Sequence, residues 1–160
     1  MKKDLIIFGS KSAAIVVLTE ILQLKMFNVV GFVDDYVEAD QPVFKWKDKT
    51  YFTLGSTQHF FRHKINDLNT RNLGGVMGVG FNHFKKKIVD QVFELSQNFE
   101  WQSIISKNST LNGICEIGEG TVILSGVTVN TGTKFGRFCK INTSSSIDHD
   151  NVFSDYASCG

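Results

Sequence analysis

The stretch that decides the fold is "LNGICEIGEGTVILSGVTVNTGTKFGRFCKINTSSSIDHDNVFSDYASCG", residues 111–160. An apolar residue returns at every sixth position along it, nine times in succession. These positions are Leu111, Ile117, Ile123, Val129, Phe135, Ile141, Ile147, Phe153 and Cys159. A helix repeats about every 3.6 residues and a half-buried strand about every two, so neither element accounts for this period.

A second set of positions follows four residues after each of the first eight, and nearly all of its members are small. They are Cys115, Thr121, Val127, Thr133, Cys139, Ser145, Asn151 and Ala157. This is the pattern of the hexapeptide repeat of a parallel β-helix, in which the apolar residue points into the narrow core and the small one lies near a corner. A run of β-hairpins that happens to keep phase is the alternative, and nine members in register argue against it.

The first half of the chain follows another rule and is predicted to be α/β. A short apolar strand over residues 4–9 ends in Gly9, and residues 27–35 form a second apolar strand that ends in two acids. Between them, residues 11–26 have apolar side chains at helical spacing. The predicted stripe is Ile15, Leu18, Leu22 and Met26. A strand, a helix and a second strand in this order predict a parallel sheet.

A third strand is expected over residues 74–80, followed by a helix over 82–98 with Asn82 as its N-cap. Residues 44–52 are interpreted as an edge hairpin and residues 56–67 as a short helix. The join between the two halves falls at about residues 99–110. We therefore expect a Rossmann-like α/β domain over residues 1–100 and a β-helix over residues 101–160.

The composition excludes several classes of protein. With 17 basic and 16 acidic residues, the 160-residue chain has a formal net charge of +1, which argues against nucleic acid as its main partner. The longest apolar run, residues 13–18, is too short to span a bilayer, and no signal peptide is evident. The three cysteines form no CxxC pair, which favours reduced thiols and a cytoplasmic location.

The turn after the first strand has the chemistry of a phosphate site. Gly9 permits a tight turn into the helix, whose N-terminal N–H groups attract anions. Ser10, Lys11 and Ser12 would add further donors. The alternative is that Gly9 is only a turn glycine and Asp34 only a cap. A nicotinamide cofactor would require two more glycines than "GSKSAA" supplies, so it is disfavoured.

With both halves considered, the sequence resembles the bacterial sugar O- and N-acetyltransferases of the sialic acid O-acetyltransferase and bacillosamine N-acetyltransferase type. The matching segments are "IIFGSKSAA", "GFVDD", "GVGFNHFKKKI" and "INTSSSIDHDNVFSDYAS". The resemblance implies a left-handed β-helix and a trimer with active sites between neighbouring β-helices. It also implies acetyl-CoA as co-substrate, a nucleotide-linked sugar as acceptor in surface glycan synthesis, and no metal.

The resemblance also assigns roles to residues. His149 is implied as the general base, Asp150 as the carboxylate that orients it, and Asn142 as a contact of the acceptor. The expected nucleotide contacts are the Gly9 turn with Ser10, Lys11 and Ser12, then Asp34, Asp35, Gly80 and Asn82. From residue chemistry alone, a solvent-exposed turn histidine is the other interpretation of His149.

Two departures from the family pattern bear on function. Ser158 stands where relatives have a second histidine that contacts the acetyl-CoA end. Relatives also have further coils after this point, so we expect a truncated transferase, or an open solenoid end that a partner covers. A non-catalytic nucleotide-sugar-binding or assembly protein is therefore the alternative function. His59, His63 and His83 show no convincing metal-ligand spacing: His59 and His63 would share one helix face, but no third ligand is evident, so no metal is expected.

Overall fold

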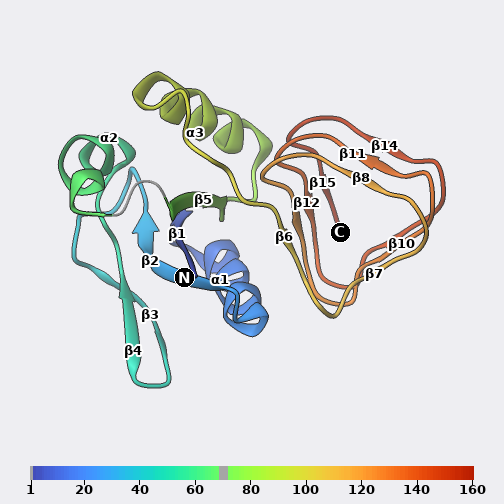
Figure 1. Cartoon of the computed structure of the whole chain (residues 1–160), viewed down its shortest axis with the longest axis horizontal. Coiled ribbons are helices and arrows are strands. Elements are labelled where there is room, and N and C mark those ends of the chain that lie inside the picture. The colour runs from blue at the N-terminus through green and yellow to red at the C-terminus, as the bar shows by residue number, and fades with distance from the viewer. Residues whose placement is uncertain (1, 69–71) are drawn as a thin grey trace.

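The computed structural model describes residues 2–68 and 72–160. Its first half contains a parallel sheet of three strands in the order β2-β1-β5: β1 is Lys3–Phe8, β2 is Phe27–Val33 and β5 is Leu73–Met77. Helices α1 (Ser12–Leu24) and α3 (Asn82–Leu95) lie on opposite sides of this sheet (Figure 1). The predicted βαβ unit is confirmed, with pairing from Lys3↔Phe27 to Phe8↔Val33.

The predicted edge hairpin and the short helix after it are confirmed. Strands β3 (Pro42–Trp46) and β4 (Lys49–Phe52) form an antiparallel hairpin. A short irregular helix follows, made of α2 (Thr57–His59), a π-helical turn over Phe60–Lys64 and a 3₁₀ turn over Ile65–Asp67. Ser56 caps its start by accepting a hydrogen bond from the His59 N–H at 3.2 Å.

Two details of the helices were predicted wrongly. Helix α1 ends at Leu24, where Lys25 takes a left-handed conformation with φ of 58°, so Met26 lies outside the helix and is exposed. Of the predicted stripe, Leu18 is buried and Leu22 packs against the core, and the rest of the buried apolar face of α1 is made by Ala14, Val17 and Ile21. Helix α3 begins at Asn82 itself, and its N-cap is Phe81, so the Asn82 side chain does not cap it.

The second half is a three-faced solenoid of short parallel strands. One face stacks β6 (Ile104–Ile105), β9 (Val122–Ile123), β12 (Lys140–Ile141) and β15 (Ser158–Cys159). The second stacks β7 (Thr110–Leu111), β10 (Thr128–Val129) and β13 (Ser146–Ile147). The third stacks β8 (Glu116–Ile117), β11 (Lys134–Phe135) and β14 (Val152–Phe153). The predicted parallel β-helix is therefore confirmed.

Pairing within a face fixes the length of a coil. Thr110 pairs with Thr128, which pairs with Ser146, so three hexapeptides make one turn of the solenoid. Members of the apolar series such as Ile123, Val129 and Ile141 are fully buried in its core. The series also extends one step further back than predicted, because Ile105 of β6 occupies the same register and packs against this core.

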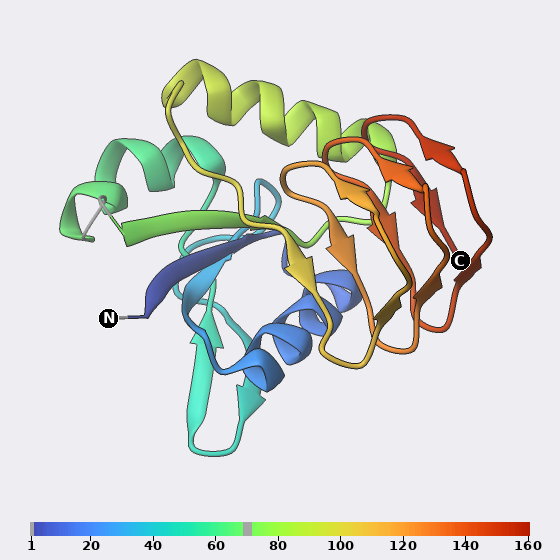
Figure 2. The same cartoon turned by 45° about the vertical axis from the view of Figure 1, so that its right-hand side comes forward.

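The two halves share buried surface. The β6/β9/β12/β15 face of the solenoid lies nearest the α/β part in both views (Figures 1 and 2). Ile104, Val122 and Leu124 of the solenoid are in one core cluster with Leu5, Val17 and other residues of β1 and α1. Phe138, from a solenoid corner, packs against Trp101, with ring centroids 5.2 Å apart. The α/β part and the solenoid therefore pack against each other through a common core.

Candidate functional site

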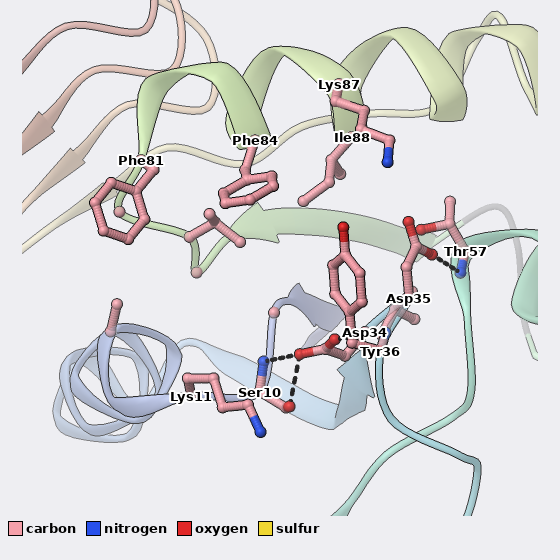
Figure 3. Close-up of a pocket in the computed structure, with 16 residues that line it drawn as sticks. Ser10, Lys11, Asp34, Asp35, Tyr36, Thr57, Phe81, Phe84, Lys87 and Ile88 are labelled. Carbon is pink, nitrogen blue, oxygen red and sulfur yellow. Dashed lines mark hydrogen bonds between the residues drawn. The ribbon is translucent and has the colours of Figure 1, made fainter.

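A pocket of about 440 Å³ lies at the carboxyl ends of the three parallel strands, between them and helix α3. Ligands of open parallel sheets bind at this edge, because the loops that follow the strands converge there. Figure 3 shows side chains of α3 facing the segment that follows β2 across this space. Its lining residues are Gly9, Ser10, Lys11, Ala13, Val33, Asp34, Asp35, Tyr36, Thr57, Gly78, Val79, Gly80, Phe81, Phe84, Lys87 and Ile88.

Asp34 is buried and its carboxylate is already bound by the protein. Its Oδ2 accepts hydrogen bonds from the Ser10 N–H at 2.9 Å and from the Ser10 hydroxyl at 2.6 Å. Its Oδ1 accepts from the Tyr36 N–H at 3.0 Å. Asp34 therefore joins the turn after β1 to the turn after β2 (Figure 3), and this geometry favours a role in shaping the pocket over direct contact with a ligand.

Asp35 is placed differently, since its side chain is exposed at the pocket. One oxygen accepts a hydrogen bond from the Thr57 N–H at 2.8 Å, at the start of α2. This bond fixes the carboxylate while leaving lone pairs on both oxygens for a ligand. Of the two acids at the end of β2, Asp35 is the one available to a bound molecule.

The phosphate-site prediction rests on the start of helix α1. The N-cap of α1 is Lys11, which is extended and makes no side-chain capping bond, so the first N–H groups of the helix have no cap from that side chain. Lys11 and Ser10 line the pocket, whereas Ser12 does not. A phosphate here would meet a helix N-terminus and the Lys11 side chain.

On the α3 side, Gly80 lines the pocket and Asn82 does not. The aromatic and apolar lining was not predicted from the sequence: it comprises Tyr36 after β2, Phe81 at the N-cap of α3, and Phe84 and Ile88 on α3. The spacing of Phe81, Phe84 and Ile88, three and then four residues, is the signal that could have identified one helix face directed at the strand ends. Lys87, from the "KKK" run, also lines the pocket.

His149 lies in the turn between β13 and β14 and is exposed. Its ring Nδ1 is 2.8 Å from Asp150 Oδ2, and its backbone N–H donates to Asp148 Oδ1 at 2.8 Å. The hydrogen bond to Asp150, together with the negative charges of Asp148 and Asp150, raises the pKa of His149 above its usual range. The predicted pairing of His149 with Asp150 is therefore present in the structure.

Asp150 lies at a tight corner of the solenoid. Asp150 has a left-handed conformation with φ of 59°, and the residue stacked beneath it in the preceding coil is Gly132, with φ of 79°. Aspartate tolerates this region better than most residues do. Asp150 therefore adopts a turn conformation at this corner, and its carboxylate lies within hydrogen-bond distance of His149 Nδ1.

The structure does not bring the other predicted residues to His149. Asn142 follows β12, at the corner that leads to β13, so it and His149 lie at opposite ends of one strand. The His149 corner joins the two solenoid faces other than β6/β9/β12/β15, and in Figure 1 the edge between those two faces, near the labels β10 and β14, lies on the side of the solenoid away from the α/β part. Within one copy, His149 and the pocket are separate.

Ser158 is placed against helix α3. Its hydroxyl is 3.1 Å from Asn82 Oδ1 and 3.4 Å from the Gly80 carbonyl oxygen, and it accepts a hydrogen bond from Lys85 Nζ at 3.1 Å. Among residues 2–68 and 72–160, no three His, Cys, Asp or Glu side chains gather as a metal site. Helices long and apolar enough to cross a bilayer are also lacking in those residues.

Comparisons with known proteins identify the fold. No family model matches the sequence, and no curated protein matches it. The structure is similar to the acetyltransferase domain of PglB from Neisseria gonorrhoeae, with a TM-score of 0.80 and 19% identity over 98% of this chain and 70% of that one. It is also similar to PerB from Caulobacter crescentus, with a TM-score of 0.77 and 18% identity over 97% and 67% of the two chains.

This chain has the fold of bacterial sugar acetyltransferases. A third neighbour, WeeI from Acinetobacter baumannii, agrees, with a TM-score of 0.77 and 18% identity over 96% of this chain and 68% of that one. The PglB domain has been solved in complex with acetyl coenzyme A, and PerB with CoA and GDP-perosamine. The similarity extends over the α/β part and the solenoid together.

Proposed function

We propose that this chain is an acetyltransferase that moves acetyl from acetyl-CoA to an amine or hydroxyl of a nucleotide-linked sugar. The observation that carries the proposal is the exposed His149–Asp150 pair, at 2.8 Å, on a solenoid of the acetyltransferase fold. We further propose that residues 1–100 hold the nucleotide and that the reaction serves surface glycan synthesis in the cytoplasm.

The pocket at the strand ends supports the nucleotide part of the proposal. The start of α1 and the Lys11 and Lys87 side chains would hold the diphosphate. Tyr36 and Phe84 offer aromatic surface to a base or a sugar, and the Asp35 carboxylate can accept hydrogen bonds from either. Asp34 would act indirectly, by fixing the turn that includes Ser10.

The chemistry assigned to His149 follows from its hydrogen bond. With Asp150 accepting from Nδ1–H, the lone pair of the neutral ring lies on Nε2. Nε2 would take the proton of the acceptor amine or hydroxyl as that atom bonds to the thioester carbonyl carbon. The C–S bond then breaks, and the departing CoA sulfur receives the proton from Nε2. No oxidant, metal or further reactant is needed for this balance.

The positions of the pocket and of His149 support a site shared between copies. The two lie on different sides of one chain, so a sugar held in the pocket would not reach the histidine of the same copy. A homotrimer in which the His149 corner of one copy lies beside another copy would bring them together. Asn142, at the other end of β13, would then contact the acceptor from a neighbouring copy, and Ser158 would lie on the CoA side.

Two titrations test this proposal. We expect calorimetry to detect binding of acetyl-CoA and, separately, of UDP or GDP as probes of the nucleotide pocket. Nucleotide binding without acetyl-CoA binding would instead support the alternative, a nucleotide-sugar-binding or assembly protein. If acetyl-CoA, UDP and GDP all fail to bind, both functions are contradicted.

A further inference from the structure

Lys85 is a buried lysine that the proposed mechanism does not use. It lies on α3 and its residue is 0% exposed. Its Nζ donates to the Phe138 carbonyl at 3.1 Å, the Ala157 carbonyl at 3.3 Å and the Ser158 hydroxyl at 3.1 Å. An ammonium group has three N–H donors, so each of them has a partner.

The acceptors belong to two successive coils of the solenoid at a single corner. Phe138 follows β11, whereas Ala157 and Ser158 lie one coil later, around the start of β15. The rings of Phe138 and Tyr156 stack across the same two coils, with centroids 5.4 Å apart. Lys85 therefore attaches helix α3 to two coils at once.

The same hydrogen-bond cluster continues to the rim of the pocket. The Ser158 oxygen accepts a hydrogen bond from Lys85, so its own O–H can donate to Asn82 Oδ1 at 3.1 Å or to the Gly80 carbonyl oxygen at 3.4 Å. Gly80 lines the pocket, and Asn82 is the first residue of α3. One chain of hydrogen bonds thus runs from the solenoid coil to the turn between β5 and α3.

Stability alone does not account for this arrangement. No ion pair among the described residues includes Lys85, and burial lowers its pKa to about 8. A buried charge is costly, and an apolar residue of similar volume is often equal or better for stability. A hydrogen-bonded cation, however, has directional bonds that fix one geometry, which a methionine at this place would lack.

We propose that Lys85 is a positioning residue that fixes the α3 wall of the pocket relative to the solenoid coil that includes Ser158. Its Nζ contacts Phe138, Ala157 and Ser158 of the solenoid, and Lys85 is not among the residues that line the pocket, so it would act through the Gly80–Asn82 turn and not by touching a ligand. That the wall belongs to a nucleotide-sugar site rests on the proposed function. The coupling of α3 to the solenoid through Lys85 does not depend on that function.

The test compares Lys85→Met with Lys85→Arg and with Lys86→Met. Lys86 is the matched control, because it is the next lysine on the helix but is exposed and paired with Asp90. Amide hydrogen exchange is measured without ligand. We expect Lys85→Met to speed exchange about tenfold in the peptides that contain residues 80–84 and 157–159, the scale of one lost hydrogen bond. Lys85→Arg should restore protection, and Lys86→Met should match the parent chain.

Binding measurements complete the test. Lys85→Met should weaken UDP or GDP binding several-fold, whereas Lys85→Arg should recover it. If the parent chain binds neither nucleotide, the proposed function fails, and the exchange data still decide the coupling. Parent-like exchange in Lys85→Met over residues 80–84 would overturn the proposal.

A second variant covers the case in which Lys85→Met lowers stability throughout the chain. Ser158→Ala keeps the lysine and its two carbonyl acceptors, and removes the exposed hydroxyl that connects Lys85 to Gly80 and Asn82. Faster exchange confined to residues 80–84 in this variant supports the coupling. Unchanged exchange there overturns it.

Discussion

The charge state of His149 is set by its two acidic neighbours. Asp150 accepts from the ring at 2.8 Å and Asp148 adds a second negative charge, and together they raise the pKa of His149. The proposed general base would act only when neutral, so the raised pKa would move the acid limb of the rate profile to higher pH. In the proposed reaction, His149 would be a stronger base but would be active over less of the mildly acidic range.

Asp150→Asn tests this directly. The amide removes both the charge and the carboxylate acceptor, so the pKa of His149 falls toward its ordinary value and the acid limb of kcat/KM shifts to lower pH. The plateau rate should fall as well, because the ring is less basic and less well oriented. His149→Ala should lower the rate at least about a hundredfold. An acid limb at the same pH in Asp150→Asn would remove the pair from the mechanism.

Asp34 and Asp35 are adjacent in sequence but are predicted to respond differently to substitution. Asp34→Ala removes three hydrogen bonds from a buried carboxylate. We expect urea unfolding to show a loss of about 2 to 3 kcal/mol, the scale for a buried charged acceptor. Asp35→Ala should cost less than about 1 kcal/mol but should weaken nucleotide binding. Equal effects on stability would contradict these assignments.

At the scale of the element, the solenoid strands depend on the apolar member of each hexapeptide. Ile123 is fully buried, so Ile123→Ala should lower the free energy of unfolding by about 2 to 5 kcal/mol. Val152, one residue before the apolar member of β14, is 77% exposed and is the control, with less than about 1 kcal/mol expected for Val152→Ala. Equal losses would mean that the period was assigned in the wrong phase.

Lys85 of helix α3 is expected to make the free energy of unfolding depend on pH. Burial lowers the pKa of Lys85 to about 8, with Cys139 opposing and Lys140 adding to the shift. Between about pH 8 and the ordinary lysine pKa, the unfolded chain therefore binds more protons than the folded one, and Lys85 makes stability rise with pH. Relative to Lys85→Met, the parent chain should gain stability across this window in urea unfolding. A difference that stays flat with pH would contradict the burial of a cation.

The period of six was sufficient to predict the solenoid, because each strand is short and its buried side chain is set by the coil geometry. The pocket walls were harder to predict. Phe81 and Phe84 resemble ordinary helix residues until the sheet places strand ends opposite them. Asn82 resembles an N-cap, but its side-chain oxygen accepts a hydrogen bond from the hydroxyl of Ser158, which is 76 residues away in the sequence. Such long-range hydrogen bonds leave no local sequence signal.

At the scale of the whole molecule, the pocket and His149 lie on different sides of one copy. If the site is shared between copies, an Asp35 and Tyr36 double alanine variant and a His149→Ala variant should each be inactive alone. Mixed and reassembled, they should recover roughly a quarter of the parent rate, from random mixing of copies in a ring. Light scattering should give the mass of a trimer. No recovery from a trimer that exchanges copies would contradict a shared site.

The most direct test of the central claim is release of the CoA thiol from acetyl-CoA in the presence of nucleotide-linked amino sugars. We predict release that requires both substrates, transfers acetyl to the sugar as seen by mass spectrometry, and is lost in His149→Ala. No acetylated sugar from any acceptor tested, with acetyl-CoA and nucleotide both bound to the folded protein, would contradict the assignment of this chain as an acetyltransferase.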